Sequence, residues 1–393
     1  MTTRSVELLR VVHAHPGVTR ADAARRLGIG TGAATELVSR LAQAHLLAEA
    51  PAAPSGARGR PTTVLVPHPD GPLVVAAEIT HEGWRLDVVE LGGATLTSVS
   101  GTHTDTSWPS VVATVNAATD ALYKTYPGRL RAMGVSVPGT VSRTLRLDAT
   151  NLGWHDVDLT ELWPSTVFVA GNDASLAAAA ESARGAATGA RLALHLRIEG
   201  GLGGAAVDQG RLLIGASGYS GEFGHMPFGD PGISCPCGAR GCWGTAVDGT
   251  ALARHLGHPA PHDPVSYARR VIASAVASRH GVLVAESLAA ADGGSVGGAE
   301  SGEWQAVCTV AAALGRGIAG LVNGLDADLV TLGGVGVDLL AAAEAEIQAA
   351  YRAGLMAIRR DDPPPILPAA LGADGPIAGA GEEAWSSLIP HLA

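Results

Sequence analysis

The opening of the chain carries apolar residues at helical spacing. Residues 4–14 repeat them with a period that predicts a short helix with one buried face. After a Pro-Gly turn, Thr19 is followed three positions later by Asp22, the arrangement of a capping threonine at a helix start. We expect this second helix to run to Leu27 and to end at Gly28.

A third helix is predicted from Thr31, because apolar residues recur at i, i+3, i+4 and i+7: Ala34, Leu37, Val38 and Leu41. The opposite face then carries Thr31, Gly32, Ala33, Thr35, Glu36, Ser39 and Arg40. Two short helices joined by a glycine-containing turn are typical of a helix-turn-helix, whose second helix lies in the major groove. The side chains expected to face DNA are Thr31, Gly32, Thr35 and Arg40.

A basic segment follows these helices. Ser55–Pro61 holds Arg58 and Arg60, and Thr62–Val66 has the composition of a strand. This order predicts a wing whose tip offers the two arginines to phosphates or to a narrow minor groove. The alternative is a three-helix bundle used for protein contacts, followed by a flexible basic linker.

From Leu73 onward, apolar runs of strand length alternate with helical segments, which predicts an α/β protein of two halves with ligand residues at strand ends. The expected strands are Leu73–Ile79, Trp84–Leu91, Leu130–Pro138, Val167–Ala170, Leu192–Ile198 and Leu329–Leu332. The expected helices are Val112–Tyr123, an alanine-rich segment ending at Glu181, Trp304–Leu321 and the end of Ala370–Leu388. Residues 287–303, rich in Ala, Gly and Ser, are predicted to form a mobile loop.

The composition and charge of the chain limit the classes of function that it can have. The 393 residues suffice for two or three domains, with neither a long apolar run nor a signal segment, so we expect a soluble cytoplasmic protein away from membranes. The first seventy residues hold eight arginines against five acidic residues, a net charge of +3, within a chain of net charge -10. The remainder carries -13 and would repel nucleic acid, so DNA should meet the amino-terminal piece.

Three of the four cysteines lie close together, at Cys235, Cys237 and Cys242, and His225 precedes the first of them by ten positions. Three thiols and one imidazole are the usual ligands of a closed, tetrahedral structural Zn²⁺ site. The alternatives are three buried thiols, or a disulfide with one cysteine left over.

The segment G-E-F-G-H followed by C-P-C-G-A-R-G-C resembles the signature of the ROK family of repressors and sugar kinases. The resemblance implies a two-lobed body of the actin/hexokinase type behind the winged helix-turn-helix. It also implies that Glu222 and His225 contact a sugar, with His225 binding zinc through its other ring nitrogen. By the same resemblance, Asn172 and Asp173 bind the sugar, and Asp173 would be the general base in a kinase. On its own, Asp173 also fits a helix cap.

The segments that correspond to the kinases' phosphate loops depart from the family pattern. Glu78–Glu82 stands where the kinases have D-x-G-G-T, and Glu199–Ala205 stands where they have G-T-G-x-G-G-G. Each change removes glycines or a hydroxyl donor and adds a carboxylate, which repels phosphate. Gly244 replaces a family glutamate that binds the sugar, and Asp248 is a candidate substitute.

The sequence therefore predicts three parts: a winged helix-turn-helix at residues 1–70, a first lobe at 71–185 with 370–393 packing back, and a second lobe at 186–369 with the zinc segment. The expected function is a sugar-responsive transcriptional regulator, a repressor, with a non-catalytic sensor body. It would bind operator DNA and a carbohydrate effector as a homodimer or higher homo-oligomer. The alternatives are an active ATP-dependent sugar kinase with an accessory DNA-binding domain, and a constitutive DNA-binding protein.

Overall fold

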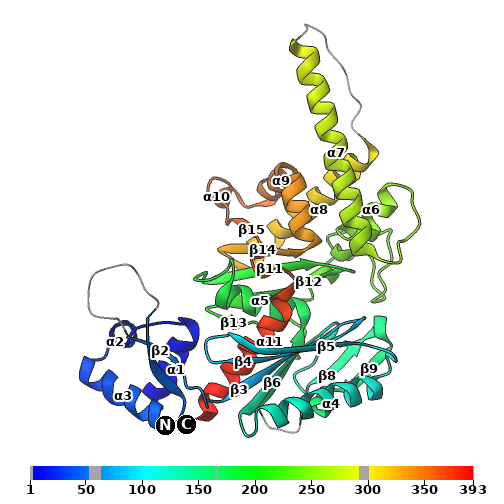
Figure 1. The fold of residues 1–393 in the computed structure, drawn as a ribbon. Helices are drawn as coiled ribbons and strands as arrows, with labels where there is room; N and C mark the ends of the chain where they lie inside the picture. The colour runs from blue at the N-terminus through cyan, green and yellow to red at the C-terminus, as the bar shows by residue number, and fades with distance from the viewer. Residues whose placement is uncertain (1–2, 53–62, 164–166, 292–300, 393) are drawn as a thin grey trace. The chain divides into compact units, whose positions relative to one another are not determined.

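The computed structural model describes residues 3–52, 63–163, 167–291 and 301–392 (Figure 1). The chain divides into two compact units. The first unit joins Met1–Ala183 to the carboxyl-terminal Asp374–Ala393, and the second is Arg184–Ala373. The amino-terminal head packs as part of the first unit, and its separation as a domain at residue 70 stays a prediction.

The head contains the three expected helices: α1 Thr3–Ala14, α2 Arg20–Leu27 and α3 Thr31–Gln43. The Thr19 side chain caps α2 by accepting the amide hydrogen of Asp22 at 3.1 Å. Gly28 ends α2 in the left-handed conformation, with φ of 63°. An antiparallel hairpin follows, in which β2 (Thr63–Pro67) pairs with β1 (Leu47–Pro51), a strand that the sequence analysis missed. The predicted wing tip, with Arg58 and Arg60, lies outside the described residues.

The main sheet of the first unit has the order β10-β6-β3-β4-β5. Its strands are β3 Leu73–Ile79, β4 Gly83–Glu90, β5 Thr95–Thr102, β6 Leu130–Val137 and β10 Phe168–Asn172. Strands β3, β6 and β10 are parallel, and Asn172 pairs with Val137 at their carboxyl ends. This register brings Asn172 beside the Val-Pro-Gly turn that follows β6.

Helix α4 (Trp108–Thr125), helix α5 (Asp173–Arg184) and helix α11 (Gly375–Leu388) complete the first unit, with short helices η1 (Thr150–Leu152), η2 (Leu159–Leu162) and η6 (Ile389–Leu392). A small antiparallel sheet was not predicted from the sequence; its strands are β7 Thr140–Val141, β8 Arg146–Ala149 and β9 Trp154–Asp158. Helix α11 approaches α5 so closely that a Cβ added to Gly379 would lie 1.8 Å from the carbonyl oxygen of Leu176. Glycine at this position is therefore required by packing.

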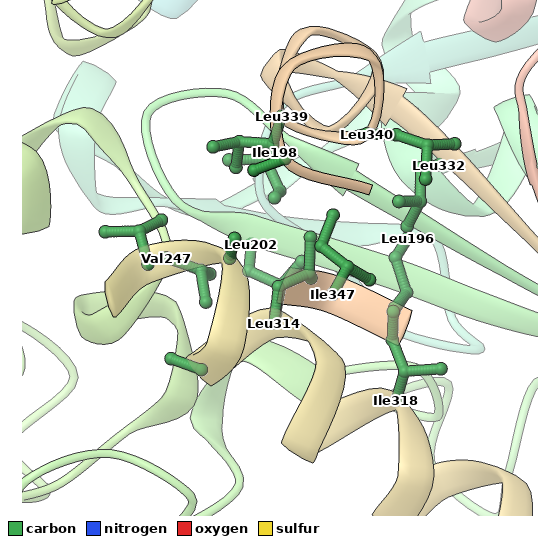
Figure 2. Packing of buried hydrophobic residues seen from close by; sticks show 14 of the residues in the cluster. Leu196, Ile198, Leu202, Val247, Leu314, Ile318, Leu332, Leu339, Leu340 and Ile347 are labelled. Atoms are coloured by element: carbon green, nitrogen blue, oxygen red, sulfur yellow. The ribbon is translucent and has the colours of Figure 1, made fainter. Parts of the chain in front are cut away.

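The sheet of the second unit has the order β13-β12-β11-β14-β15. Its strands are β11 Leu192–Ile198, β12 Leu202–Asp208, β13 Arg211–Leu212, β14 Leu329–Gly334 and β15 Ile366–Pro368. Its helices are α6 Gly249–His255, α7 Pro264–Ala291, α8 Gly302–Leu325, α9 Val335–Gly354 and α10 Ala357–Arg360, with short helices η3 Phe223–His225, η4 Trp243–Ala246 and η5 Gly372–Asp374. Figure 2 shows the core, in which Leu196 of β11 and Leu332 of β14 meet Leu314 of α8 and Ile347 of α9.

The predicted loop at residues 287–303 is wrong at both ends, because α7 continues to Ala291 and α8 begins at Gly302. Alanine is the best helix former, and here its propensity outweighs the loop-like composition. The rest of that segment, 292–300, lies outside the described residues. Helix α8 is long and apolar enough to cross a membrane by composition, but 67% of its most apolar window is buried in the protein. It is a core helix of the second unit.

Candidate functional site

The cysteine cluster of the second unit lies between η3 and η4. His225 belongs to η3, and Cys242 immediately precedes η4. One ligand atom from each of His225, Cys235, Cys237 and Cys242 lies within 4.8 Å of the other three. The fold therefore places the four predicted metal ligands around one point.

The distances within this cluster fit a tetrahedral metal site. The Cys237 and Cys242 sulfurs are 3.7 Å apart, and the Cys235 sulfur is 3.7 Å from Nδ1 of His225. Sulfurs that share a Zn²⁺ at about 2.3 Å are roughly 3.8 Å apart in tetrahedral geometry. A disulfide needs about 2.05 Å, and all four cysteines are free, so the disulfide alternative fails.

The backbone and the burial of the cluster bear on its thiol chemistry. The Cys235 amide donates to the Ala239 carbonyl at 2.8 Å and closes a tight turn, in which Gly238 has φ of 93°. The backbone amide of Ala239 lowers the pKa of the Cys237 thiol. Burial raises the pKa of the Cys242 thiol to about 12, so this sulfur needs a cation to become a thiolate at neutral pH. The donor set and its spacing thus suit Zn²⁺.

His225 also lies beside Glu222, the other residue of this segment that is predicted to contact a sugar. Its Nδ1 is turned toward Cys235, and its Nε2 lies 3.7 Å from a carboxylate oxygen of Glu222. Both side chains are about half exposed, at 47% and 41%. A Cβ added to Gly224 would lie 2.1 Å from the carbonyl oxygen of Leu202, so this glycine lets the segment pack directly on β12. A metal at Nδ1 would fix the ring and leave Nε2 and Glu222 available to a ligand.

The other two predicted sugar residues belong to the first unit. Asn172 ends β10, donates from Nδ2 to the Gly139 carbonyl at 2.9 Å and accepts the Ala174 amide hydrogen at 2.9 Å. Asp173 begins α5 and also accepts from the Ala174 amide, at 2.8 Å. The residue in the cap position is Asn172, which precedes α5 and accepts from the second helical amide, whereas Asp173 is the first residue of the helix. Asn172 and Asp173 are in one unit, and Glu222 and His225 are in the other.

The first altered phosphate loop is the turn between β3 and β4. The Thr80 hydroxyl accepts hydrogen bonds from the amides of Glu82 and Gly83, each at 3.2 Å. These amides are the kind of donor that a phosphate loop offers, and here the protein's own hydroxyl binds them. A hollow of about 270 Å³ beside the turn is lined by Glu78, Thr80, Glu82, Gly83, Trp84, Arg85, Gly101 and Thr102.

The second altered loop is the hairpin between β11 and β12. The Glu199 carboxylate pairs with the Arg197 guanidinium at 2.8 Å. A Cβ added to Gly334, the residue before α9, would lie 3.2 Å from the same Glu199 carboxylate. A carboxylate thus lies close to the beginning of α9, a position that attracts anions. The sequence analysis did not identify Arg197; the i, i+2 Arg-Glu spacing on a strand was the available signal.

Gly244 and Asp248 differ in what they can contribute. A Cβ added to the buried Gly244 would meet its nearest atoms at 3.4 Å, which is ordinary contact, so the first side-chain carbon fits without a clash. Asp248 caps α6 by accepting the Ala251 amide hydrogen at 2.8 Å, and it is 8% exposed. Its carboxylate is already used inside the fold, so it is a poor substitute for the family glutamate.

The predicted DNA-facing residues of α3 lie on its exposed face. Thr31, Gly32, Thr35 and Arg40 are exposed, while Ala34, Leu37, Val38 and Leu41 are buried. Arg40 pairs with Glu36 at 2.9 Å along the same face. The pattern of buried and exposed positions is confirmed.

Together, these features define a class: an α/β protein with a sugar-kinase-like fold, a Cys3His cluster and a helical head. A sequence model of the ROK family matches residues 83–384, and the chain belongs to the ROK family. A ROK family transcriptional regulator described as a homolog of the E. coli MLC protein has the same fold over 99% of this chain and 96% of its own. The TM-score is 0.73 at 20% identity.

Curated relatives include both kinds of family member. A glucokinase of Halalkalibacterium halodurans is 31% identical over 233 residues, 56% of this chain and 68% of its own length. A xylose repressor of Bacillus subtilis is 34% identical over 135 residues, 33% of this chain. The chain thus matches only 35% of the repressor's length.

Proposed function

We propose that this protein is a sugar-responsive transcriptional repressor whose kinase-like body senses a carbohydrate and whose head binds operator DNA. The proposal depends on one observation: the two segments that correspond to the kinases' phosphate loops are altered, in a chain that also has a three-helix head. In the first loop the Thr80 hydroxyl binds the turn amides, and in the second the Glu199 carboxylate lies near the start of α9. Phosphoryl transfer depends on positioning and on positive charge, and both loops oppose it.

The head supplies what the DNA-binding proposal needs. Helix α3 is exposed along Thr31, Gly32, Thr35 and Arg40, and α2 packs beside it as the first helix of a helix-turn-helix. Arg58 and Arg60 would reach phosphates or the minor groove from the wing. We further propose a homodimer that reads a two-fold operator, because paired half-sites are how such heads gain affinity and register.

The sensor would bind its carbohydrate through Asn172 and Asp173 from one unit and Glu222 and His225 from the other. Zn²⁺ in the Cys3His cluster would be structural, holding the imidazole of His225 by Nδ1 while Nε2 faces the ligand. A ligand bound by residues of both units favours one arrangement of the units over others. If that arrangement changes the spacing of two heads in a dimer, sugar changes operator affinity by linkage. Such a protein would work in the cytoplasm, where DNA is accessible and thiolates stay reduced.

The rival function is an ATP-dependent sugar kinase with an accessory DNA-binding head, and the glucokinase relative favours it. Asp173 would then act as general base. This alternative predicts ATP turnover that depends on a sugar and disappears in Asp173→Asn. We expect no such turnover with a panel of hexoses, N-acetylhexosamines and oligosaccharides.

The direct test is DNA binding with and without sugar. Fragments of the region upstream of the chain's own gene are titrated with the zinc-loaded protein, first at low salt and then at physiological salt. We expect specific binding that one member of the sugar panel weakens, and that Arg40→Ala weakens without sugar. Binding that no sugar changes would favour the constitutive alternative, and no binding to any duplex would refute the proposal.

A further inference from the structure

Two histidines and one aspartate form a cluster where the head joins the first sheet. His45 follows α3, and His68 and Asp70 lie between β2 and β3. One ligand atom from each of these residues lies within 4.8 Å of the other two. The cluster is separate from the Cys3His cluster, which belongs to the other unit.

His45 occupies a backbone position that a residue with a side chain rarely takes. Its φ is 56°, in the left-handed region. The amides of His45 and Leu46 donate to the carbonyls of Ala42 and Leu41, at 3.0 and 2.9 Å, which is the helix ending that usually carries glycine at this position. This conformation is less favourable for histidine than for glycine, and the position places the imidazole beside His68.

The two imidazoles lie close enough together to bind one ion. Their ring centroids are 4.5 Å apart, with an angle of 32° between the planes. Two imidazoles bound at adjacent positions of one cation, at about 2.0–2.1 Å, have centroids roughly 4.5–5 Å apart. The Asp70 amide donates to Nδ1 of His68 at 3.1 Å, which holds this ring beside the aspartate.

We propose that His45, His68 and Asp70 bind a first-row divalent cation of the Zn²⁺ or Ni²⁺ type. Two imidazole nitrogens and a carboxylate oxygen suit such ions, and water would complete the coordination. His45 and Asp70 are exposed and His68 is half-buried, so the ion has access from solvent. A cation at Nδ1 of His68 would replace the hydrogen bond from the Asp70 amide, so we expect weaker affinity than at the thiolate cluster.

The bound ion would fasten the end of α3 to the segment that enters the first sheet. That segment is already anchored, because the Gly71 amide donates to the His68 carbonyl at 2.8 Å and Arg129 donates to the Gly71 carbonyl at 2.9 Å. The cation would therefore cross-link the end of α3 to a segment that hydrogen bonds already hold against the first sheet. This inference does not depend on the proposed function.

Calorimetric titration of the zinc-loaded full chain with Ni²⁺ tests the site. We expect one Ni²⁺ per chain, a rise in the thermal unfolding midpoint, and affinity about tenfold or more lower in His68→Ala and in His45→Gly. Glycine suits the left-handed position, so a loss of binding in His45→Gly comes from the missing imidazole and not from misfolding.

The matched control is His155→Ala, which removes a single exposed histidine 3.6 Å from the Asp148 carboxylate. It should leave the Ni²⁺ titration unchanged. Absence of Ni²⁺ binding by the unmodified chain would overturn the inference. So would equal binding by His45→Gly, or a loss of binding in His155→Ala.

Discussion

His13 of α1 donates a hydrogen bond from Nε2 to a carboxylate oxygen of Glu382 in α11, at 3.0 Å. The direction follows from the other ring nitrogen, because Nδ1 accepts the Gly92 amide hydrogen at 3.0 Å and so carries no proton. Both side chains are almost buried, at 10% and 12% exposure. A hydrogen bond thus joins the head to α11 of the first unit.

This bond lies on a continuous route from the proposed sugar residues to the head. Asp173 begins α5, and α5 contacts α11 backbone to backbone where Gly379 meets Leu176. Helix α11 in turn carries Glu382, which binds His13. If ligand binding shifts α5, we expect these contacts to transmit the shift to α1.

Removing this bond should weaken the response to sugar without abolishing sugar binding. We expect His13→Ala to lower the free energy of unfolding by about 1–3 kcal/mol, and to reduce the difference in operator affinity measured with and without sugar. Glu382→Gln can still accept from Nε2 and should have a smaller effect. The control is Glu7→Gln, which breaks an exposed pair with Arg4 on the same helix. An undiminished sugar response in His13→Ala would contradict the proposed route.

The metal cluster makes a separate prediction. Cys237→Ser should lose the tightly held zinc and lower the thermal unfolding midpoint, because a structural zinc contributes folding free energy directly. Cys237 is exposed, so the substitution itself leaves no cavity. The control is Cys308→Ser, which alters the fourth cysteine, in α8. Elemental analysis of dialysed protein measures the metal, and native protein without zinc would refute the assignment.

Sequence patterns predicted the elements with strong local signals. Thr19 and Gly28 marked α2, and the i, i+3, i+4 spacing set the buried face of α3, because caps and amphipathic faces depend on neighbouring residues. The ligands of the metal cluster were also predictable, since they lie in one short segment. Strand β5, whose exposed face is mostly Thr and Ser, gave no apolar alternation strong enough to detect.

Other features depend on long-range contacts. The bond between His13 and Glu382 joins residues 369 positions apart, and the approach of Gly379 to Leu176 depends on how two helices pack. The cluster of His45 with His68 and Asp70 forms only when β1 pairs with β2 and brings the two ends of the hairpin together. No local pattern specifies these contacts.

Restoring the family glutamate tests the sugar site. We expect Gly244→Glu to bind the effector sugar about tenfold more tightly, because a charged hydrogen bond to a sugar hydroxyl contributes about 1.5–3 kcal/mol. The nearest atoms to an added Cβ lie at 3.4 Å, so the first side-chain carbon fits without a clash. Gly244→Ala is the control and should leave affinity unchanged. Titration calorimetry measures both, and equal affinity of the Glu and Ala variants would show that this position does not contact the sugar.

The buried His195 of β11 predicts a loss of stability in acid. The Thr331 hydroxyl donates to the Leu194 carbonyl at 3.3 Å, so Nδ1 of His195 donates to that hydroxyl at 2.9 Å. Its Nε2 is buried and has no hydrogen-bond partner among the described residues. Burial, followed by the charge of Arg197, lowers the pKa of His195 to about 3.

In the unfolded chain, His195 binds a proton below a pKa of about 6.5. In the folded chain it stays neutral until about pH 3. The free energy of unfolding is therefore not reduced by this histidine above pH 6.5, and it declines as the pH falls from 6.5 toward 3. Between pH 7 and pH 5 we expect a loss on the order of 2 kcal/mol. His195→Gln keeps an amide near Thr331 but does not titrate, so its unfolding midpoint should fall less over the same range. Parallel pH profiles for the two proteins would show that His195 is not the group that titrates.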